Sequence, residues 1–135
     1  MILKYTFSIM SYETLYHKVL LDHYNHPKHR GALLNPDVSS GVFNPSCGDQ
    51  VAIQALVNNE KITICKFEGK GCVISLAAAS MLTEWATDKT LQEVQDFSSQ
   101  DMLHMVKVQL GPNRVRCALL ALEALHTGIK NYLKK

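Results

Sequence analysis

The sequence predicts a single α+β domain in which a small antiparallel three-stranded sheet packs against helices on one side. Segments 50–57 and 62–68 have the composition of strands, and the turn "NNEK" between them predicts a hairpin. Segment 74–87 and the segment from residue 112 onward are rich in helix-forming residues. The chain has 135 residues, 47% of them hydrophobic and 19% charged, which is typical of one globular domain with its own core.

The N-terminal part is expected to contain one helix and one long loop. Ser11 can cap a helix that runs to about His26, where Pro27 stops it. Residues 27–46 hold several Pro, Gly and Asn and predict a loop, with a short strand at 42–43.

The domain is expected to cover residues 10–135, and residues 1–9 to be an optional extension. Met10 directly precedes the capped helix, and the opening "MILKYTFSI" lacks the clear cleavage site of a signal peptide. The basic cluster "HPKHR" at 26–30 is either a solvated loop or a docking point for an acidic partner.

Three helices are expected after the hairpin. The bend "GKGC" leads into the Ala-rich helix at 74–87, and Thr90 with Glu93 forms a capping box for a short helix. Ser99 is predicted to cap another helix through about Lys107. The breaker "LGPN" then precedes a final helix with one apolar stripe, made of Val115, Leu119, Leu122, Leu125, Ile129 and Leu133.

The composition argues against several classes of protein. A net charge of +2, with acids and bases mixed, predicts no nucleic-acid partner, and no apolar stretch is long enough to predict a membrane span. Four cysteines are too few for a disulfide scaffold in a chain of this length. We therefore expect a cytoplasmic protein whose thiols are free to bind metal or to carry sulfur.

The segment "FNPSCGDQ" places a thiol and a carboxylate two residues apart in a turn. In an extended backbone residues i and i+2 point the same way, so Cys47 and Asp49 can offer a sulfur and an oxygen to one point. Gly48 between them lets the backbone come close to a bound group. The alternative is a buried cysteine beside an aspartate that tightens the turn.

Two further cysteines lie where helices are expected to begin. Cys72 ends the glycine-rich bend, and a helix N-terminus stabilises a thiolate there. Cys117 lies about 135° from the centre of the apolar stripe, at 100° per residue, so it is expected to point away from the core. Its expected place in the first turn also favours the thiolate. For Cys72 the alternative is a small hydrophobic residue at a helix entry.

Cys65 lies inside the second hairpin strand and is expected to be a small buried side chain. The other three cysteines and Asp49 make four potential ligands that suit tetrahedral zinc, and thiolates also suit iron–sulfur clusters. The residues alone predict a thiolate-rich metal or sulfur site.

Four segments carry a family resemblance: "DHYNHPKHRG", "NPSCGDQ", "KFEGKGCVISLAAASML" and "RVRCALLALEAL". The chain resembles the NifU/IscU-type proteins of iron–sulfur cluster assembly from Met10 onward. The resemblance implies that Cys47, Asp49, Cys72 and Cys117 bind the metal or cluster. Cys65 matches no ligand of the family.

The resemblance also points to two branches of this family. The scaffold branch usually carries a histidine just before its last cysteine, whereas this chain has Arg116. "RVRCALL" looks more like the zinc-binding SufU branch, in which the position of Arg114 takes part in partner docking. SufU proteins usually have a longer insertion before this helix, and the span from Cys72 to Cys117 looks short for one.

The resemblance implies a scaffold and sulfur acceptor rather than a stand-alone enzyme. Cys117 is the candidate acceptor of persulfide sulfur from a cysteine desulfurase, and Cys47, Asp49 and Cys72 would hold zinc at rest or iron while a [2Fe–2S] cluster is built. Recipient or carrier proteins would then take the cluster. The alternative is a zinc-dependent sulfurtransferase that activates the desulfurase and hosts no cluster.

Overall fold

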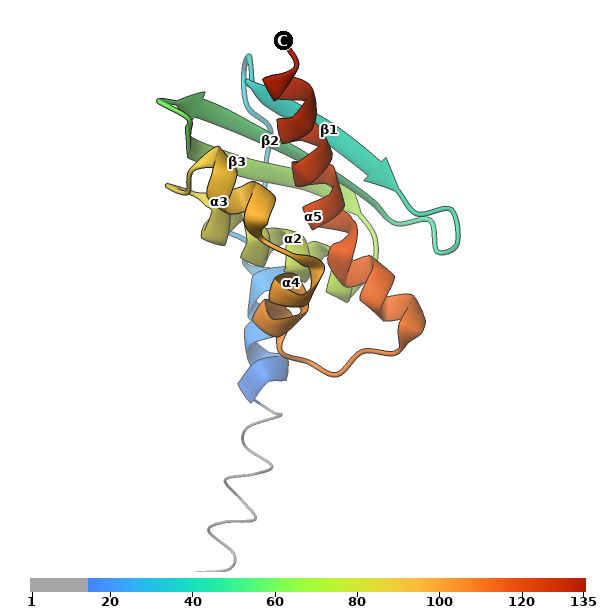
Figure 1. Ribbon diagram of the computed structural model, residues 1–135. Coiled ribbons are helices and arrows are strands. Elements are labelled where there is room, and N and C mark those ends of the chain that lie inside the picture. Colours follow the sequence, from blue (N-terminus) through green and yellow to red (C-terminus); the bar gives the residue numbers. More distant parts are fainter. Residues whose placement is uncertain (1–14) are drawn as a thin grey trace, which may run out of the picture.

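The computed structural model describes residues 15–135, which form a three-stranded antiparallel sheet with helices on one face (Figure 1). Strands β1 (Val38–Phe43), β2 (Gln50–Asn58) and β3 (Lys61–Lys70) follow one another in the sheet in chain order. The predicted fold class is confirmed. The predicted cap Ser11 and the optional extension 1–9 lie outside the described residues.

The strands pair in continuous register apart from one irregularity between Leu56 and Val57. β1 is longer than the predicted strand at 42–43, because pairing with β2 draws Ser39, Ser40 and Gly41 into the ladder. Their own strand propensity is low, so this part of the strand could not be predicted from local sequence.

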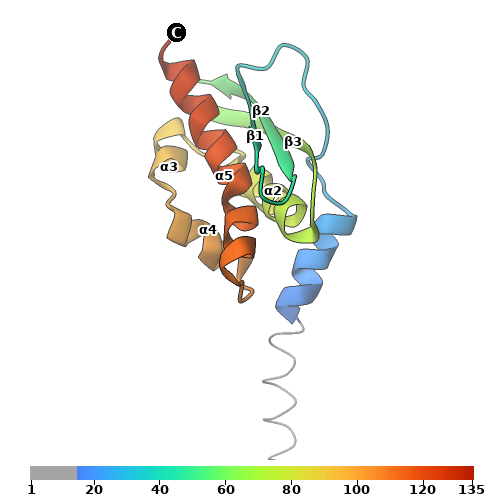
Figure 2. The ribbon, with the colours of Figure 1, turned by 90° about the vertical axis from the view of Figure 1, so that its right-hand side faces the viewer.

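The helices form two layers on the sheet. Helices α2 (Val73–Ala86) and α5 (Pro112–Leu133) lie directly on it, while α3 (Leu91–Asp96) and α4 (Ser99–Val106) pack outside them. Figure 2 shows the helices gathered on one side of the strands, with the helical segment 15–25 at the lower end. Within residues 15–135 no helix combines the length and apolar content needed to cross a membrane.

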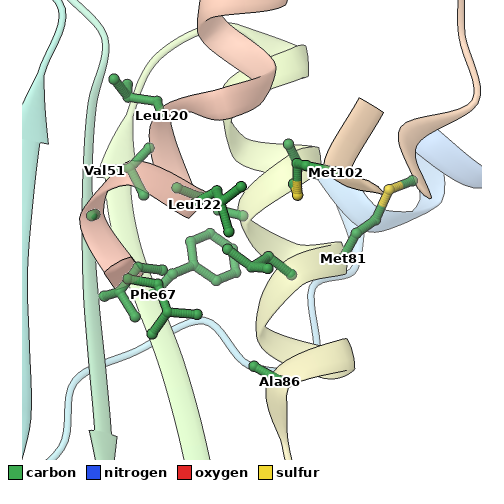
Figure 3. Packing of buried hydrophobic residues seen from close by; sticks show 14 of the residues in the cluster. Val51, Phe67, Met81, Ala86, Met102, Leu120 and Leu122 are labelled. Carbon is green, nitrogen blue, oxygen red and sulfur yellow. The ribbon is translucent and has the colours of Figure 1, made fainter. Parts of the chain in front are cut away.

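The core lies between the sheet and these helices. Phe67 from β3 packs among buried side chains of α2 and α5, and Met102 of α4 closes the far side (Figure 3). The capping box of Thr90 and Glu93 is present as predicted. The next cap is Ser98 with Asp101 rather than Ser99, because this pair exchanges side-chain and backbone hydrogen bonds around the first turn of α4.

The buried face of α5 differs from the predicted stripe. Small residues are buried on it, among them Ala118, Ala121 and Gly128, while Leu133 is 58% exposed. A side chain at Gly128 would place a Cβ 2.7 Å from Cγ1 of Val38. The helix therefore approaches β1 through small residues. The predicted stripe was built from large apolar residues only, and these do not show which face of α5 is buried.

Candidate metal centre

The loop between β1 and β2 is folded by Asn44 and carries an exposed thiol. The backbone N–H of Asn44 donates to the carbonyl of Asp49 over 2.8 Å, and the N–H of Gly48 donates to the carbonyl of Asn44 over 2.8 Å. The side-chain oxygen of Asn44 accepts from the N–H of Ser46. Gly48 has φ +81°, a conformation that suits glycine. This turn presents Cys47 at the surface.

Asp49 is a buried carboxylate that its neighbours keep ionised. It is 5% exposed, and its Oδ2 accepts a hydrogen bond of 2.5 Å from the Ser75 hydroxyl. Burial raises the pKa of Asp49, but hydrogen bonds from Ser75, from the side chain and backbone of Cys72 and from Cys117 outweigh it and lower the pKa. A negative oxygen is therefore maintained beside two thiols.

The bend before α2 brings Cys72 to this carboxylate. Cys72 is the N-cap residue of α2, as predicted, and its Sγ lies 3.5 Å from the Ser75 hydroxyl. A Cβ on Gly71 would lie 2.8 Å from Cγ of Asp49, so only glycine leaves room for the carboxylate. Sequence reasoning missed Ser75, although its place three residues after the N-cap puts it beside Cys72.

Both physical reasons given for an exposed, reactive Cys117 are wrong. Cys117 is 6% exposed, because the buried face of α5 extends over the neighbouring small residues. It lies in the second turn, and its thiol donates to the carbonyl of Asn113 over 3.5 Å instead of meeting free N–H groups. Burial, together with Cys72 and Asp49, raises its pKa to about 12. Without a metal, Cys117 is a neutral thiol.

The structure brings three of the four predicted ligands within reach of one ion, and the fourth lines the same cavity. One ligand atom from each of Cys47, Asp49 and Cys117 lies within 4.8 Å of the others, and the two sulfurs are 4.0 Å apart. Cys72 lines the same cavity of about 360 Å³. These residues come from the β1–β2 loop, the bend after β3 and α5, which are far apart in the sequence.

This donor set fits a tetrahedral metal ion. Zinc–sulfur bonds of about 2.3 Å in a tetrahedron place two sulfurs about 3.8 Å apart, close to the 4.0 Å between Cys47 and Cys117. Deprotonated thiolates and a carboxylate are the ligands that zinc and iron take. The high pKa of Cys117 does not oppose binding, because a coordinated thiol is deprotonated by the metal.

The remaining candidates separate into residues at the site and residues away from it. Arg114 and Arg116 are exposed and line the cavity of the cysteines.

Cys65 is fully buried in the sheet as predicted, and burial raises its pKa to about 12. In the basic cluster, Arg30 donates to Glu68 and to the carbonyl of Gly69, so it fastens the loop to β3.

With this geometry in view, the comparison with protein families is decisive. A family model described as the NifU-like N-terminal domain matches residues 15–135. The chain belongs to the NifU-like N-terminal domain family. The predicted resemblance is confirmed, while the exact boundary at residue 10 stays a prediction.

Relatives in this family come from both predicted branches. The chain is 32% identical to the zinc-dependent sulfurtransferase SufU of Bacillus subtilis, over 87% of this chain and 90% of SufU. It is 34% identical to the iron–sulfur cluster assembly scaffold protein IscU of Escherichia coli (strain K12), over 89% of this chain and 95% of IscU.

Solved structures in the NifU-like family share the fold. One is a protein from Fervidobacterium islandicum, assigned as an iron–sulfur cluster assembly scaffold of the SUF system. It superposes with a TM-score of 0.74 and 28% identity, over 82% of this chain and 93% of that one. A NifU-like protein from Brucella abortus, 21% identical with a TM-score of 0.73, supports the fold alone.

Proposed function

We propose that this chain is an iron–sulfur cluster assembly protein that accepts sulfur from a cysteine desulfurase and hosts a [2Fe–2S] cluster as its cargo. One observation carries the proposal: three thiols and an ionised carboxylate converge in one surface cavity of a NifU-family domain. The relatives named as scaffold and sulfurtransferase support it. Its proposed location is the cytoplasm, and its proposed downstream partners are cluster carriers or recipients.

We assign Cys47, Asp49, Cys72 and Cys117 as the ligands of the resting metal, for which zinc is the candidate, and of the cluster iron. A bound zinc ion would hold the cysteines as thiolates and shield them from oxidation. Asp49 is the one hard oxygen ligand among soft sulfurs. Asp49 would therefore be the ligand that is exchanged most readily when the site releases its cargo.

Sulfur transfer needs a thiolate that the donor can reach. Cys47 is exposed on its loop, whereas Cys117 is buried. Cys47 is therefore the first acceptor, and Cys117 the second, with its sulfur 4.0 Å away. In each transfer the acceptor thiolate attacks the outer sulfur of the donor persulfide. The donor S–S bond breaks, the donor leaves as a thiolate, and the persulfide forms on the acceptor without net oxidation.

Arg114 and Arg116 are assigned to partner docking. Both are exposed at the cavity of the cysteines, and the ion pairs found within residues 15–135 involve neither of them. Free guanidinium groups at the entrance favour a partner that presents carboxylates.

The second candidate is a zinc-dependent sulfurtransferase without a cluster. It is favoured by Arg116, which stands where scaffolds usually carry a histidine. The alignment lengths favour the scaffold. The match to SufU spans 134 aligned positions, which is more than the number of residues in the covered 87% of this chain. The surplus positions are gaps in this chain, so SufU carries residues there that this chain lacks.

Anaerobic reconstitution separates the two functions. Full-length protein is incubated with ferrous iron, cysteine, the desulfurase and dithiothreitol, which supplies the electrons that reduce persulfide sulfur to sulfide, and the visible absorption spectrum is followed. A stable cluster spectrum that Cys72→Ala removes is the expected result. Faster alanine release by the desulfurase with no cluster formed would contradict the scaffold and support the sulfurtransferase.

A further inference from the structure

The sheet has two edges, and the fold covers one of them. Along the outer edge of β3, the N–H of Ile62 donates to Lys89 and its carbonyl accepts from Asp88. Farther along, the N–H of Phe67 donates to His29 and its carbonyl accepts from Gly31. Backbone groups at both ends of this edge are therefore satisfied by loops.

The edge of β1 is open. Within residues 15–135, the backbone hydrogen bonds of β1 run to β2. Its sequence, "VSSGVF", contains no charge and no proline, and its register with β2 has no bulge. Charged residues, prolines and bulges are the features by which proteins protect edge strands from pairing, and β1 has none of them. β1 is therefore built to accept another strand.

A hollow lies on each side of this edge, near its end at Phe43. On the outer face of the sheet a hollow of about 530 Å³ extends from Gly41 of β1 across Ala52 of β2 to β3, where the charged side chains of Arg30, Glu68 and Lys70 line it. On the helix side a hollow of about 220 Å³ lies between residues 42–45 and residues 116–123 of α5, with Arg116 and Glu123 as its charged lining residues. Phe43, 56% exposed, lines both. A strand added to β1 would send alternate side chains to these two sides.

The inner hollow is continuous with the cavity of the cysteines. Asn44 and Arg116 line both. A protein bound over the cysteines therefore lies next to the end of β1, and Arg116 stands at the junction as a cation that a carboxylate can neutralise.

We infer that the partner bound at the cysteine site adds an extended segment of its own chain to the free edge of β1. Apolar side chains on one face of the segment enter the inner hollow beside Leu119 and Leu120, side chains on its other face lie at the β1 side of the outer hollow, and a carboxylate at the end near the site faces Arg116. The inference rests on the proposed function, since the partner in question is the cysteine desulfurase. Backbone hydrogen bonds supply affinity in this mode, and the hollows supply specificity.

A partner segment fits this edge better than a second copy of the chain. A second β1 paired antiparallel with the first, centre to centre, would place Val38, Ser39 and Ser40 at the Phe43 end, where the hollows lie. These side chains are too small to fill hollows of about 530 Å³ and 220 Å³.

The test compares edge variants of the zinc-loaded, full-length protein. Gly41→Lys and Ser39→Lys place a charge on the open edge, and a Cβ at Gly41 meets its nearest atom at 3.8 Å, so the change fits the fold. Thr63→Lys makes the same change in charge at an exposed position of β3. Affinity for the purified desulfurase, its alanine release and hydrogen exchange of peptides covering 38–43 are measured.

We expect both edge variants to weaken binding at least about tenfold, and Thr63→Lys to stay within about twofold. Segment 38–43 of the wild type should exchange more slowly in the complex. If the wild type stimulates the desulfurase while the edge variants bind equally well and 38–43 exchanges unchanged, the inference fails and the proposed function stands.

Two other results also overturn the inference. If the wild type neither binds the desulfurase nor forms a cluster, the proposed function fails with it. If the protein alone is a dimer that Gly41→Lys splits into monomers, the edge holds a second copy and not a partner segment.

Discussion

Asp49 shows how single residues set the chemistry of the site. Its carboxylate is buried, yet three neighbours donate hydrogen bonds that lower its pKa. Ser75 is the neighbour whose hydroxyl approaches closest, at 2.5 Å from Oδ2. This bond engages one carboxylate oxygen and fixes the orientation of the other. Ser75 therefore positions a proposed ligand without being one.

Ser75→Ala is predicted to lower zinc affinity about 10- to 100-fold, because groups that orient metal ligands have effects of this size. Competition with a chromophoric chelator measures it, with the exposed Ser39→Ala as the control. Equal zinc affinity in the two variants would contradict a positioning role for Ser75.

Cys65 predicts a loss of stability in alkaline solution. Burial raises its pKa from 9.0 to about 12, so its neutral form stabilises the fold below pH 9.0 and this contribution is lost as the pH rises toward 12. By about pH 10.5 the loss is about 2 kcal/mol.

Urea denaturation of the metal-free protein at about pH 8 and about pH 10.5 measures this loss. Cys65→Ala should lose about 2 kcal/mol less than the wild type between the two values, because the cost of the smaller side chain is common to both. An identical loss in the two proteins would show that Cys65 does not titrate in this range.

At the scale of elements, the bend between β3 and α2 sets the distance from Asp49 to Cys72. Gly71 allows the Asp49 carboxylate to reach the start of α2, because a Cβ at position 71 would lie only 2.8 Å from Cγ of Asp49. The bend thus joins two proposed ligands that come from different elements. At Gly111, the N-cap of α5, an added Cβ would instead meet no atom within 4 Å.

Gly71→Ala is predicted to displace the Asp49 carboxylate and to lower zinc affinity at least about tenfold. Gly111→Ala, with nothing within 4 Å of the added carbon, should leave affinity unchanged. The same chelator competition measures both. Unchanged zinc affinity in Gly71→Ala would mean that zinc binding does not require the Asp49 carboxylate in its present position.

On the scale of the whole molecule, we expect the core to form without the metal. The sheet, α2 and α5 enclose a continuous set of buried side chains; of the proposed ligands, Cys117 belongs to this set and Cys72 packs against it. A bound metal would then add stability by mass action without creating the fold. This argues against a purely structural zinc module.

Removal of zinc with a chelator is predicted to lower the Tm while unfolding stays cooperative. Hydrogen exchange should accelerate in segments 44–49 and 70–72 and remain slow in β2 and α5, whose backbone bonds do not involve the site. Cooperative loss of the entire fold on chelation would instead favour the structural module.

The fold could be predicted from local signals, but parts of the site could not. Hairpin strands, capping residues and the breaker before α5 are encoded within a few residues of one another. The burial of Cys117 is not, because it depends on how closely α5 approaches the sheet through Ala118 and Gly128. Ser75 was missed for a similar reason, since only the tertiary approach of Asp49 gives its hydroxyl a role.

X-ray absorption at the zinc edge of the purified, zinc-loaded protein tests the central claim most directly. Four ligands from Cys47, Asp49, Cys72 and Cys117 predict about three sulfur atoms at about 2.3 Å and one oxygen at about 2.0 Å. Cys72→Ala should reduce the sulfur number by about one. A shell made only of nitrogen and oxygen, or a sulfur number unchanged in Cys72→Ala, would contradict a metal centre built from these residues.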